Sequence, residues 1–288
     1  GGENQGVPER RRGRPKSFMR RALPLLAVIF LGILLLPGRV QARAYTEVFH
    51  SGKIDWLKGT AEAVGIVLPA RGSAKAGDRA KAKPAAEAER AARRNLLDLL
   101  GKVKIDSRTS LADLFSQSET LQKEVQLLVQ KTPVQRVRNR QDGGVEATLK
   151  IQLGGALAEL VLPKDIQTID SVLQPKVPAE NAEKAFTGLI VDCSGIRVRP
   201  AMAPKVYDED GQVVYGPPFI SREYAVKEGV ARYARDLAAS KAEGRVAPRP
   251  LTVKGIRTSQ AGPSDMVISN ADAARVKASA GNLRSLQR

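Results

Sequence analysis

The 288-residue chain has a formal net charge of +17, and 42% of its residues are hydrophobic, which is enough for a real core. With one cysteine and one histidine it can form no intrachain disulfide, and metal sites built from clusters of these residues are essentially excluded. Aromatic residues make up only 4%, which leaves few rings to stack on bases. We therefore expect no nucleic-acid partner and no cofactor.

The N-terminal region has the layout of a signal peptide. Residues 1–18 carry no structural signal, and we expect them to be unstructured and to precede the native start at Met19. In residues 19–44, two arginines precede fourteen uncharged residues, a Pro-Gly break and small residues at alternating positions. The uncharged stretch is shorter than the ~20 residues of a membrane-spanning helix. The alternative is an uncleaved anchor that contacts the membrane through residues 22–36.

A first module is predicted over residues 45–162. Ile54–Pro69 has the pattern of a strand with small residues on one face. Ala70–Pro84 is rich in Ala, Lys, Arg and Gly and is predicted to be an exposed loop or the irregular start of a helix. It is read either as an anion-binding arm or as a solvated linker, and we favour the linker. The apolar stripe of Ala85–Leu100 predicts a helix that Gly101 ends.

Shorter elements complete this module. Ser110 is placed to cap a short helix, with Asp113 three residues on as in a capping box. A second helix is expected over Glu119–Lys131. Val134–Arg140 and Val145–Leu153 form the strongest predicted hairpin. Apolar and polar residues alternate without error in its second strand, which predicts one buried face and one face in water.

Three arginines on the first strand of that hairpin are the sharpest electrostatic feature of the sequence. Arg136, Arg138 and Arg140 fall on one face because strand side chains alternate. As a functional feature the row would bind an acidic partner. As a structural feature it keeps an exposed sheet face soluble and discourages edge pairing. We favour the structural interpretation.

A linker is expected over residues 163–185, followed by a second module over residues 186–288. Its central stretch begins with a predicted buried strand, Leu189–Val191, which ends on Asp192 and a glycine turn. A loop with two Xaa-Pro pairs follows, and then a hairpin turning at Asp210-Gly211. We expect Asp192 and Arg199 to anchor this loop, because its backbone polar groups need partners.

Several residues of this stretch also suit acid–base chemistry, and each has a structural explanation. Aspartates at a hairpin turn are explained by turn chemistry, and a glutamate in a first helical turn complements the helix dipole. A cysteine beside a buried strand is more often a small hydrophobe than a nucleophile. We therefore expect no catalysis. These residues are Asp192, Cys193, Arg199, Asp208, Asp210, Arg222 and Glu223.

The rest of the second module is predicted to alternate helices and strands. Ser221 is expected to cap a helix that runs to about Ser240. Strands are expected over Leu251–Ile256 and Met266–Ser269, and Ser269-Asn270 opens a last helix. The predicted fold class is α+β: two small modules after the signal segment, each a short, mostly antiparallel sheet packed with helices.

The order of elements in residues 54–160 resembles the N-terminal domain of bacterial flagellar H-ring (T-type) assembly proteins and a related small outer-membrane lipoprotein family. The later segments resemble the C-terminal half of uncharacterised exported proteins with that domain. The motifs are WLKGTAEAVG, AEAERAARRNLLDLL, VEATLKIQL, GLIVDCSGIRVRPAMAPKVYDEDGQVVYG, SREYAV and VISNADA. The chain departs from the lipoprotein pattern because no cysteine follows the apolar stretch. A final apolar strand would also be expected after the last helix, but residues 281–288 are polar, so either that strand is absent or the sequence is truncated.

The resemblance implies an exported, non-enzymatic protein, periplasmic or associated with the outer membrane of a Gram-negative-type bacterium. We expect a structural or protein-interaction module of the cell envelope, with flagellum-like assembly as one setting. The expected partners are envelope proteins, with self-association included. The alternative is a periplasmic hydrolase or ligand-binding protein that uses the Asp192/Arg199 loop.

Overall fold

The computed structural model describes residues 1–2, 43–69, 78–163, 166 and 186–278, and residues 41–288 form one compact unit. The α+β fold class is confirmed, since the unit contains two five-stranded sheets accompanied by helices. Nearly all of the predicted signal segment and linker lies outside the described residues. The module boundaries at 162 and 186 therefore stay predictions.

The first sheet is entirely antiparallel, with the strand order β1-β2-β3-β5-β4. Its longest contact is between β3 and β5, which pair over eight residues each. The strands are β1 (Thr46–Phe49), β2 (Gly52–Asp55), β3 (Thr60–Val67), β4 (Val134–Asn139) and β5 (Val145–Gln152).

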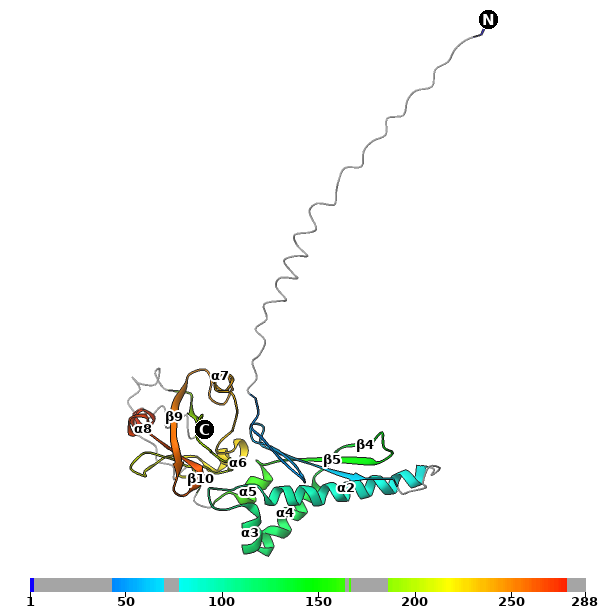
Figure 1. The fold of residues 1–288 in the computed structure, drawn as a ribbon, viewed down its shortest axis with the longest axis horizontal. Coiled ribbons are helices and arrows are strands. Elements are labelled where there is room, and N and C mark those ends of the chain that lie inside the picture. The colour runs from blue at the N-terminus through cyan, green and yellow to red at the C-terminus, as the bar shows by residue number, and fades with distance from the viewer. Residues whose placement is uncertain (3–42, 70–77, 164–165, 167–185, 279–288) are drawn as a thin grey trace. The chain divides into compact units, whose positions relative to one another are not determined.

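One long helix, α2 (Asp78–Gly101), lies along β3 and β5 (Figure 1). Its apolar stripe faces the sheet, and alanines on both elements let the backbones approach closely. The predicted helix is thus confirmed but begins earlier, and Pro84 lies inside it rather than ahead of it. Part of the predicted loop is therefore helical.

Shorter helices pack around the end of α2. They are α3 (Leu111–Gln117), α4 (Glu119–Lys131) and α5 (Ala156–Val161). The capping box that begins α3 is confirmed, because the Ser110 side chain accepts from the Asp113 backbone and the Asp113 carboxylate accepts in return. The predicted bounds of α4 are confirmed as well.

The prediction of one continuous strand over Ile54–Pro69 is wrong. The segment turns between β2 and β3, and the two strands pair with each other. The Asp55 carboxylate accepts from the backbone N–H groups of Leu57 and Lys58, which closes the turn. Trp56, which lies in this turn, is in the core at 4% exposure.

The second sheet is mixed and has the order β6-β9-β10-β7-β8. The β6–β9 and β10–β7 pairs are parallel, and the β9–β10 and β7–β8 pairs are antiparallel. Helix α8 (Asn270–Lys277) starts at the predicted Ser269 cap. The strands are β6 (Gly188–Asp192), β7 (Val206–Tyr207), β8 (Val213–Tyr215), β9 (Pro250–Ser259) and β10 (Gly262–Ile268).

The single helix predicted from Ser221 to Ser240 is also wrong. Ser221 does cap a helix, α6 (Arg222–Glu228), but that helix ends at Gly229, whose φ of +79° suits glycine. An irregular segment follows, and α7 (Leu237–Ser240) forms only one turn. The irregular segment is held by tertiary contacts, such as the edge-on packing of the Trp56 and Tyr233 rings with centroids 5.8 Å apart.

Backbone hydrogen bonds connect segments from the two predicted modules. The N–H groups of Met202 and Ala203 donate to the carbonyls of Lys104 and Ile105 over 2.9 and 2.7 Å. The Tyr45 N–H donates to the Tyr233 carbonyl at 3.3 Å. The two sheets are therefore parts of one compact unit rather than separate bodies joined only by a linker.

Candidate binding cleft

Asp192 ends β6 and fixes the turn that follows. Its carboxylate accepts from the backbone N–H of Ser194 at 2.9 Å and from the Ser194 hydroxyl, and it forms an ion pair with Lys254 on β9 at 3.0 Å. These contacts, the Ser194 hydroxyl first, lower the pKa of Asp192 to about 2. The predicted role of Asp192 as a loop anchor is consistent with this geometry.

Arg199 lies apart from Asp192. Its backbone N–H donates to the Pro263 carbonyl at 2.9 Å, but its side chain is exposed and makes no hydrogen bond or ion pair with any described residue. The anchor at this position is therefore the backbone rather than the guanidinium. A carboxylate–arginine pair between the two predicted residues does not form.

The arginine row on β4 is largely neutralised within the protein. Arg138 binds Glu146 on β5 through two nitrogens, at 2.7 and 3.0 Å, and Arg140 contacts both Glu146 and Asp142. These partners, Arg138 first, lower the pKa of Glu146. Arg136 is exposed and pairs in register with Thr148.

These contacts correct, for its first half, the prediction that the polar face of β5 is in water; Gln152 at the far end is exposed as predicted. Glu146 is only 5% exposed and Thr148 only 4%. The long arginine side chains of β4 lie across this face, and the charged pair replaces water around the Glu146 carboxylate. The geometry favours the structural interpretation of the row, because two of its three cations already have acidic partners.

A cleft of about 620 Å³ opens beside the second sheet, and this volume is within the range of ligand sites. One wall is β6 and the loop after it, and the opposite wall is the irregular segment around α7. Most of its lining is apolar. The apolar and sulfur-containing residues include Leu189, Ile190, Val191, Cys193, Ile196, Val198, Val206, Tyr215, Tyr233 and Met266.

Four basic side chains also line the cleft, and they differ in whether their N–H groups already have partners in the protein. Arg245 donates to the backbone carbonyls of residues 228–230 at 2.6 to 3.1 Å. Arg235 stacks over the Tyr45 ring at 4.7 Å. Lys58 lies at the turn after β2. Arg232 makes no hydrogen bond or ion pair with any residue that the structure describes.

Arg232 is nevertheless held in a defined recess. A Cβ atom added to Gly59 would lie 2.1 Å from Arg232 Nη1, so glycine at this position makes room for the guanidinium. Burial, followed by the charge of Arg245, lowers the pKa of Arg232. The protein therefore holds a half-buried cation whose donors the described residues leave open.

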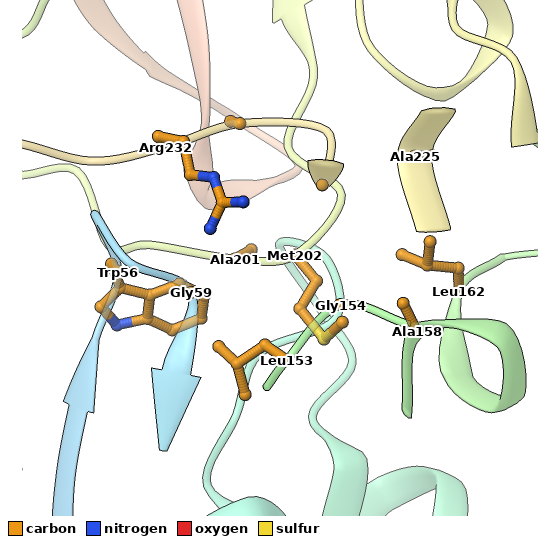
Figure 2. Close-up of a pocket in the computed structure, with 12 residues that line it drawn as sticks. Trp56, Gly59, Leu153, Gly154, Ala158, Leu162, Ala201, Met202, Ala225 and Arg232 are labelled. Atoms are coloured by element: carbon orange, nitrogen blue, oxygen red, sulfur yellow. The ribbon is translucent and has the colours of Figure 1, made fainter. Parts of the chain in front are cut away.

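Figure 2 shows a second, smaller cavity on the other side of Arg232, between it and the first sheet. Leu153, Ala158, Leu162 and Met202 contribute apolar walls, and the cavity volume is about 30 Å³. That is the volume of about one water molecule. This cavity is too small for a ligand.

The cleft does not bring together groups suited to nucleophilic chemistry among the described residues. Burial raises the pKa of the Cys193 thiol to about 11, and its sulfur contacts the Met266 sulfur at 3.2 Å. Cys193 therefore packs as a small hydrophobe. Among the residues that the structure describes, no three His, Cys, Asp or Glu side chains are grouped so as to hold a metal ion.

The other predicted acid–base candidates are explained by structure. Asp208 accepts from the Gln212 backbone at 2.7 Å and pairs with Lys277, and Asp210 accepts from Asn270. Arg222 donates to the carbonyls of Glu159 and Pro163. None of these three side chains lines the cleft.

Sequence reasoning found one wall of the cleft and missed the other. Asp192 and the apolar run of β6 are predictable from the sequence. Arg232 and Arg235 are missed because they fall in the helix predicted from Ser221 to Ser240, and Arg245 because it follows that helix. The signal that could have found them is Gly229, which ends α6 and leaves a basic, irregular segment after it.

Replacing Asp192 with asparagine is expected to reduce the free energy of unfolding by about 1 kcal/mol at pH 7, since Lys254 is half-exposed and solvent screens the pair. The folded-state pKa lies below the ordinary 3.8, so this contribution is present above about pH 4 and is lost as the pH falls through about 2. Urea unfolding at a series of pH values measures it.

The matched control is Glu124→Gln on the exposed face of α4, which should change stability little at any pH. The gap between wild type and the Asp192→Asn variant should close as the pH falls through about 2. A gap that stays constant with pH would show that the Asp192 charge does not stabilise the fold.

The fold and the cleft define a class: a two-sheet α+β protein with a mainly apolar cleft, lined also by basic and acidic side chains, beside an edge strand. Comparison with known families then gives one relation. Residues 188–288 match the family described as Treponema pallidum Tp0624, second domain. The match begins at the first residue of β6 and includes all five strands of the second sheet. No curated protein matches the chain.

Proposed function

We propose that the protein is an exported, non-catalytic module of the cell envelope that binds another envelope protein through this cleft. The observation that carries the proposal is the cleft itself: a large, mainly apolar cavity beside an edge strand. The resemblance of residues 54–160 to flagellar H-ring assembly proteins and outer-membrane lipoproteins supports an envelope role. The signal-peptide layout of residues 19–44 supports export.

Membrane contact is part of the proposal only through residues 22–36, if they are retained. Within the described ranges, none of the helices combines the length and apolar character needed to cross a bilayer.

The alternative function, hydrolysis or ligand binding by the Asp192/Arg199 loop, has less support. Asp192 lines the cleft, which is the observation in its favour. Its carboxylate, however, is occupied by Ser194 and Lys254, and a pKa of about 2 makes it a weak base. Arg199 is not among the residues that line the cleft.

Site-specific crosslinking in the native envelope tests the proposal. A photoreactive residue at Ile190 in the cleft should give a defined adduct with one envelope protein. The matched control is Leu127, an exposed apolar residue on α4 that should give no such adduct. The proposal fails if Ile190 gives no adduct. A turnover of the purified chain that Asp192→Asn abolishes with the fold intact would support the alternative function instead.

Export makes a separate prediction. The mature chain should begin near Ala44 or Tyr45, because the small residues before Tyr45 form the cleavage site. A new N-terminus at Tyr45 would still be able to donate to the Tyr233 carbonyl, which the backbone N–H contacts at 3.3 Å. Mass spectrometry of the mature N-terminus decides this, and retention of residues 23–36 would make the protein membrane-anchored instead.

A further inference from the structure

We propose that the occupant of the cleft is an extended peptide segment of the partner protein, which adds as a strand to the free edge of β6 and places a carboxylate on Arg232. The inference rests on the proposed function and specifies its ligand. It is carried by three independent features: the direction of the cleft, the free edge of the second sheet and the open donors of Arg232.

The direction of the cleft follows from which residues of β6 line it. Side chains of a strand alternate between two faces, so a cavity over one face would contact every second residue. The cleft instead contacts each consecutive residue from Leu189 to Ser194. The part of the cleft beside β6 therefore reaches the edge of that strand, and the rest extends to Val206, Tyr215 and Met266 on β7, β8 and β10.

That edge is unpaired in the described part of the chain. β6 is the outermost strand of its sheet and pairs only with β9 on its inner side. An outer strand presents backbone N–H and C=O groups that an extended peptide can bind. A small molecule in the cleft would leave these backbone groups hydrogen-bonded to water, whereas an added strand would form hydrogen bonds with them.

The usable part of the edge has two defined ends. At its start Val246 covers Gly188, where an added Cβ atom would lie 2.8 Å from the Val246 Cα, and Thr187 donates its hydroxyl to the Val246 carbonyl. At its end Asp192 turns the chain away. Residues 189–192 remain, a length of about 13 Å at 3.3 Å per residue, which fits a segment of about four residues.

The charge preference of the occupant follows from Arg232. The other two arginines of the cleft are occupied by backbone carbonyls or stack on a tyrosine ring, whereas the Arg232 guanidinium is held in its recess with its donors open. Glu228 and Glu243 also line the cleft, but neither forms an ion pair with Arg232. A planar guanidinium binds a carboxylate through two parallel hydrogen bonds. An Asp or Glu side chain, or a C-terminal carboxylate, therefore complements this position better than a neutral or basic group.

Selection from a random, phage-displayed nonapeptide library on the purified full chain tests the proposal. Enriched peptides should share an acidic residue at one position and lack proline in the central four positions, because proline removes a backbone donor. A synthetic copy of the best peptide should bind by fluorescence polarisation. It should also slow hydrogen exchange of amides in residues 189–192.

The charge contact has its own variants. Arg232→Gln should weaken peptide binding at least tenfold relative to wild type. Arg232→Lys keeps the positive charge but not the planar guanidinium, so its affinity for the peptide should lie between those of wild type and Arg232→Gln. Arg199→Gln is the matched control, since it removes an exposed arginine outside the cleft, and it should change affinity less than twofold. Circular dichroism and the thermal midpoint establish that each variant is folded.

Three outcomes would overturn the proposal: no enrichment of any peptide, binding without added protection of β6, or equal binding after the peptide acid is changed to its amide. Dodecanoate is the probe for an amphiphile. If it binds in an Arg232-dependent way and displaces the selected peptide without slowing hydrogen exchange in β6, the cleft is an amphiphile site instead of a peptide site. An envelope adduct at Ile190 alongside any of these results leaves the proposed function standing. If the Ile190 adduct is also absent, both the peptide proposal and the proposed function are rejected.

Discussion

Replacing Gly65 with alanine should lower the free energy of unfolding by about 3 kcal/mol or more. Gly65 lies in the centre of β3 against α2. A Cβ atom at this position would lie 2.1 Å from the Ala88 carbonyl oxygen and 2.2 Å from the Ala92 nitrogen. Both are backbone atoms, so the helix itself would have to move away from the sheet.

The loss is large because α2 packs along β3 and β5 and contributes five buried residues to the core of the first sheet, Ala88, Ala92, Leu96, Leu99 and Leu100. Leu96, Leu99 and Leu100 are fully buried on it, and a shift at Ala88 and Ala92 would loosen these contacts as well. Urea unfolding followed by circular dichroism measures the change.

Gly101→Ala is the matched control. It lies at the end of the same helix, where an added Cβ atom would meet the Ala112 side chain at an ordinary 3.6 Å. Alanine favours the helix there, so stability should stay within about 1 kcal/mol of wild type. If the two variants are equally stable, α2 does not pack on β3 as closely as described.

Elements that local chemistry determines were predictable from the sequence. The bounds of α4, the Ser110 capping box and the Ser269 cap each depend on residues within four positions of one another. The same holds for the two hairpins that turn near Asp142 and Asp210, because turn residues and alternating strands are local signals.

Elements that depend on distant contacts were not predictable. The turn between β2 and β3 places Trp56 in the core, where its ring meets Tyr233 from far along the chain. The segment after Gly229 has helix-compatible residues, yet it is held irregular by contacts with Trp56 and with residues 43–45. Tertiary packing overrode propensity at both places.

The candidate site divides in the same way. Asp192 was identified because its strand, turn and glycine are adjacent in sequence. The cleft was not, because its walls come from segments near residues 45–58, 189–206 and 228–246. Arg232 stands out only when the fold places it against Gly59 without a hydrogen bond or ion pair to any described residue. A row of arginines such as that on β4 is conspicuous in sequence, yet the fold supplies Glu146 to neutralise most of it.

Tyr233 connects the cleft wall to the loop that follows β6, and its hydroxyl makes two hydrogen bonds to one residue. It donates to the Ala201 carbonyl at 3.0 Å and accepts from the Ala201 N–H at 3.1 Å. Ala201 is 1% exposed, so water cannot easily replace the hydroxyl. Burial accordingly raises the pKa of Tyr233, which stays neutral and able to donate.

Tyr233→Phe should therefore cost about 3 kcal/mol, because it leaves a buried N–H and a buried carbonyl without partners at about 1–3 kcal/mol each. Tyr224→Phe is the matched control. Its ring lies under the Arg245 guanidinium at 5.2 Å, a contact that phenylalanine keeps, and its hydroxyl makes no hydrogen bond to any described residue. That variant should stay within about 0.5 kcal/mol of wild type. Thermal and urea unfolding of both variants measure the difference, and equal losses would mean that the Ala201 contacts do not hold the loop in place.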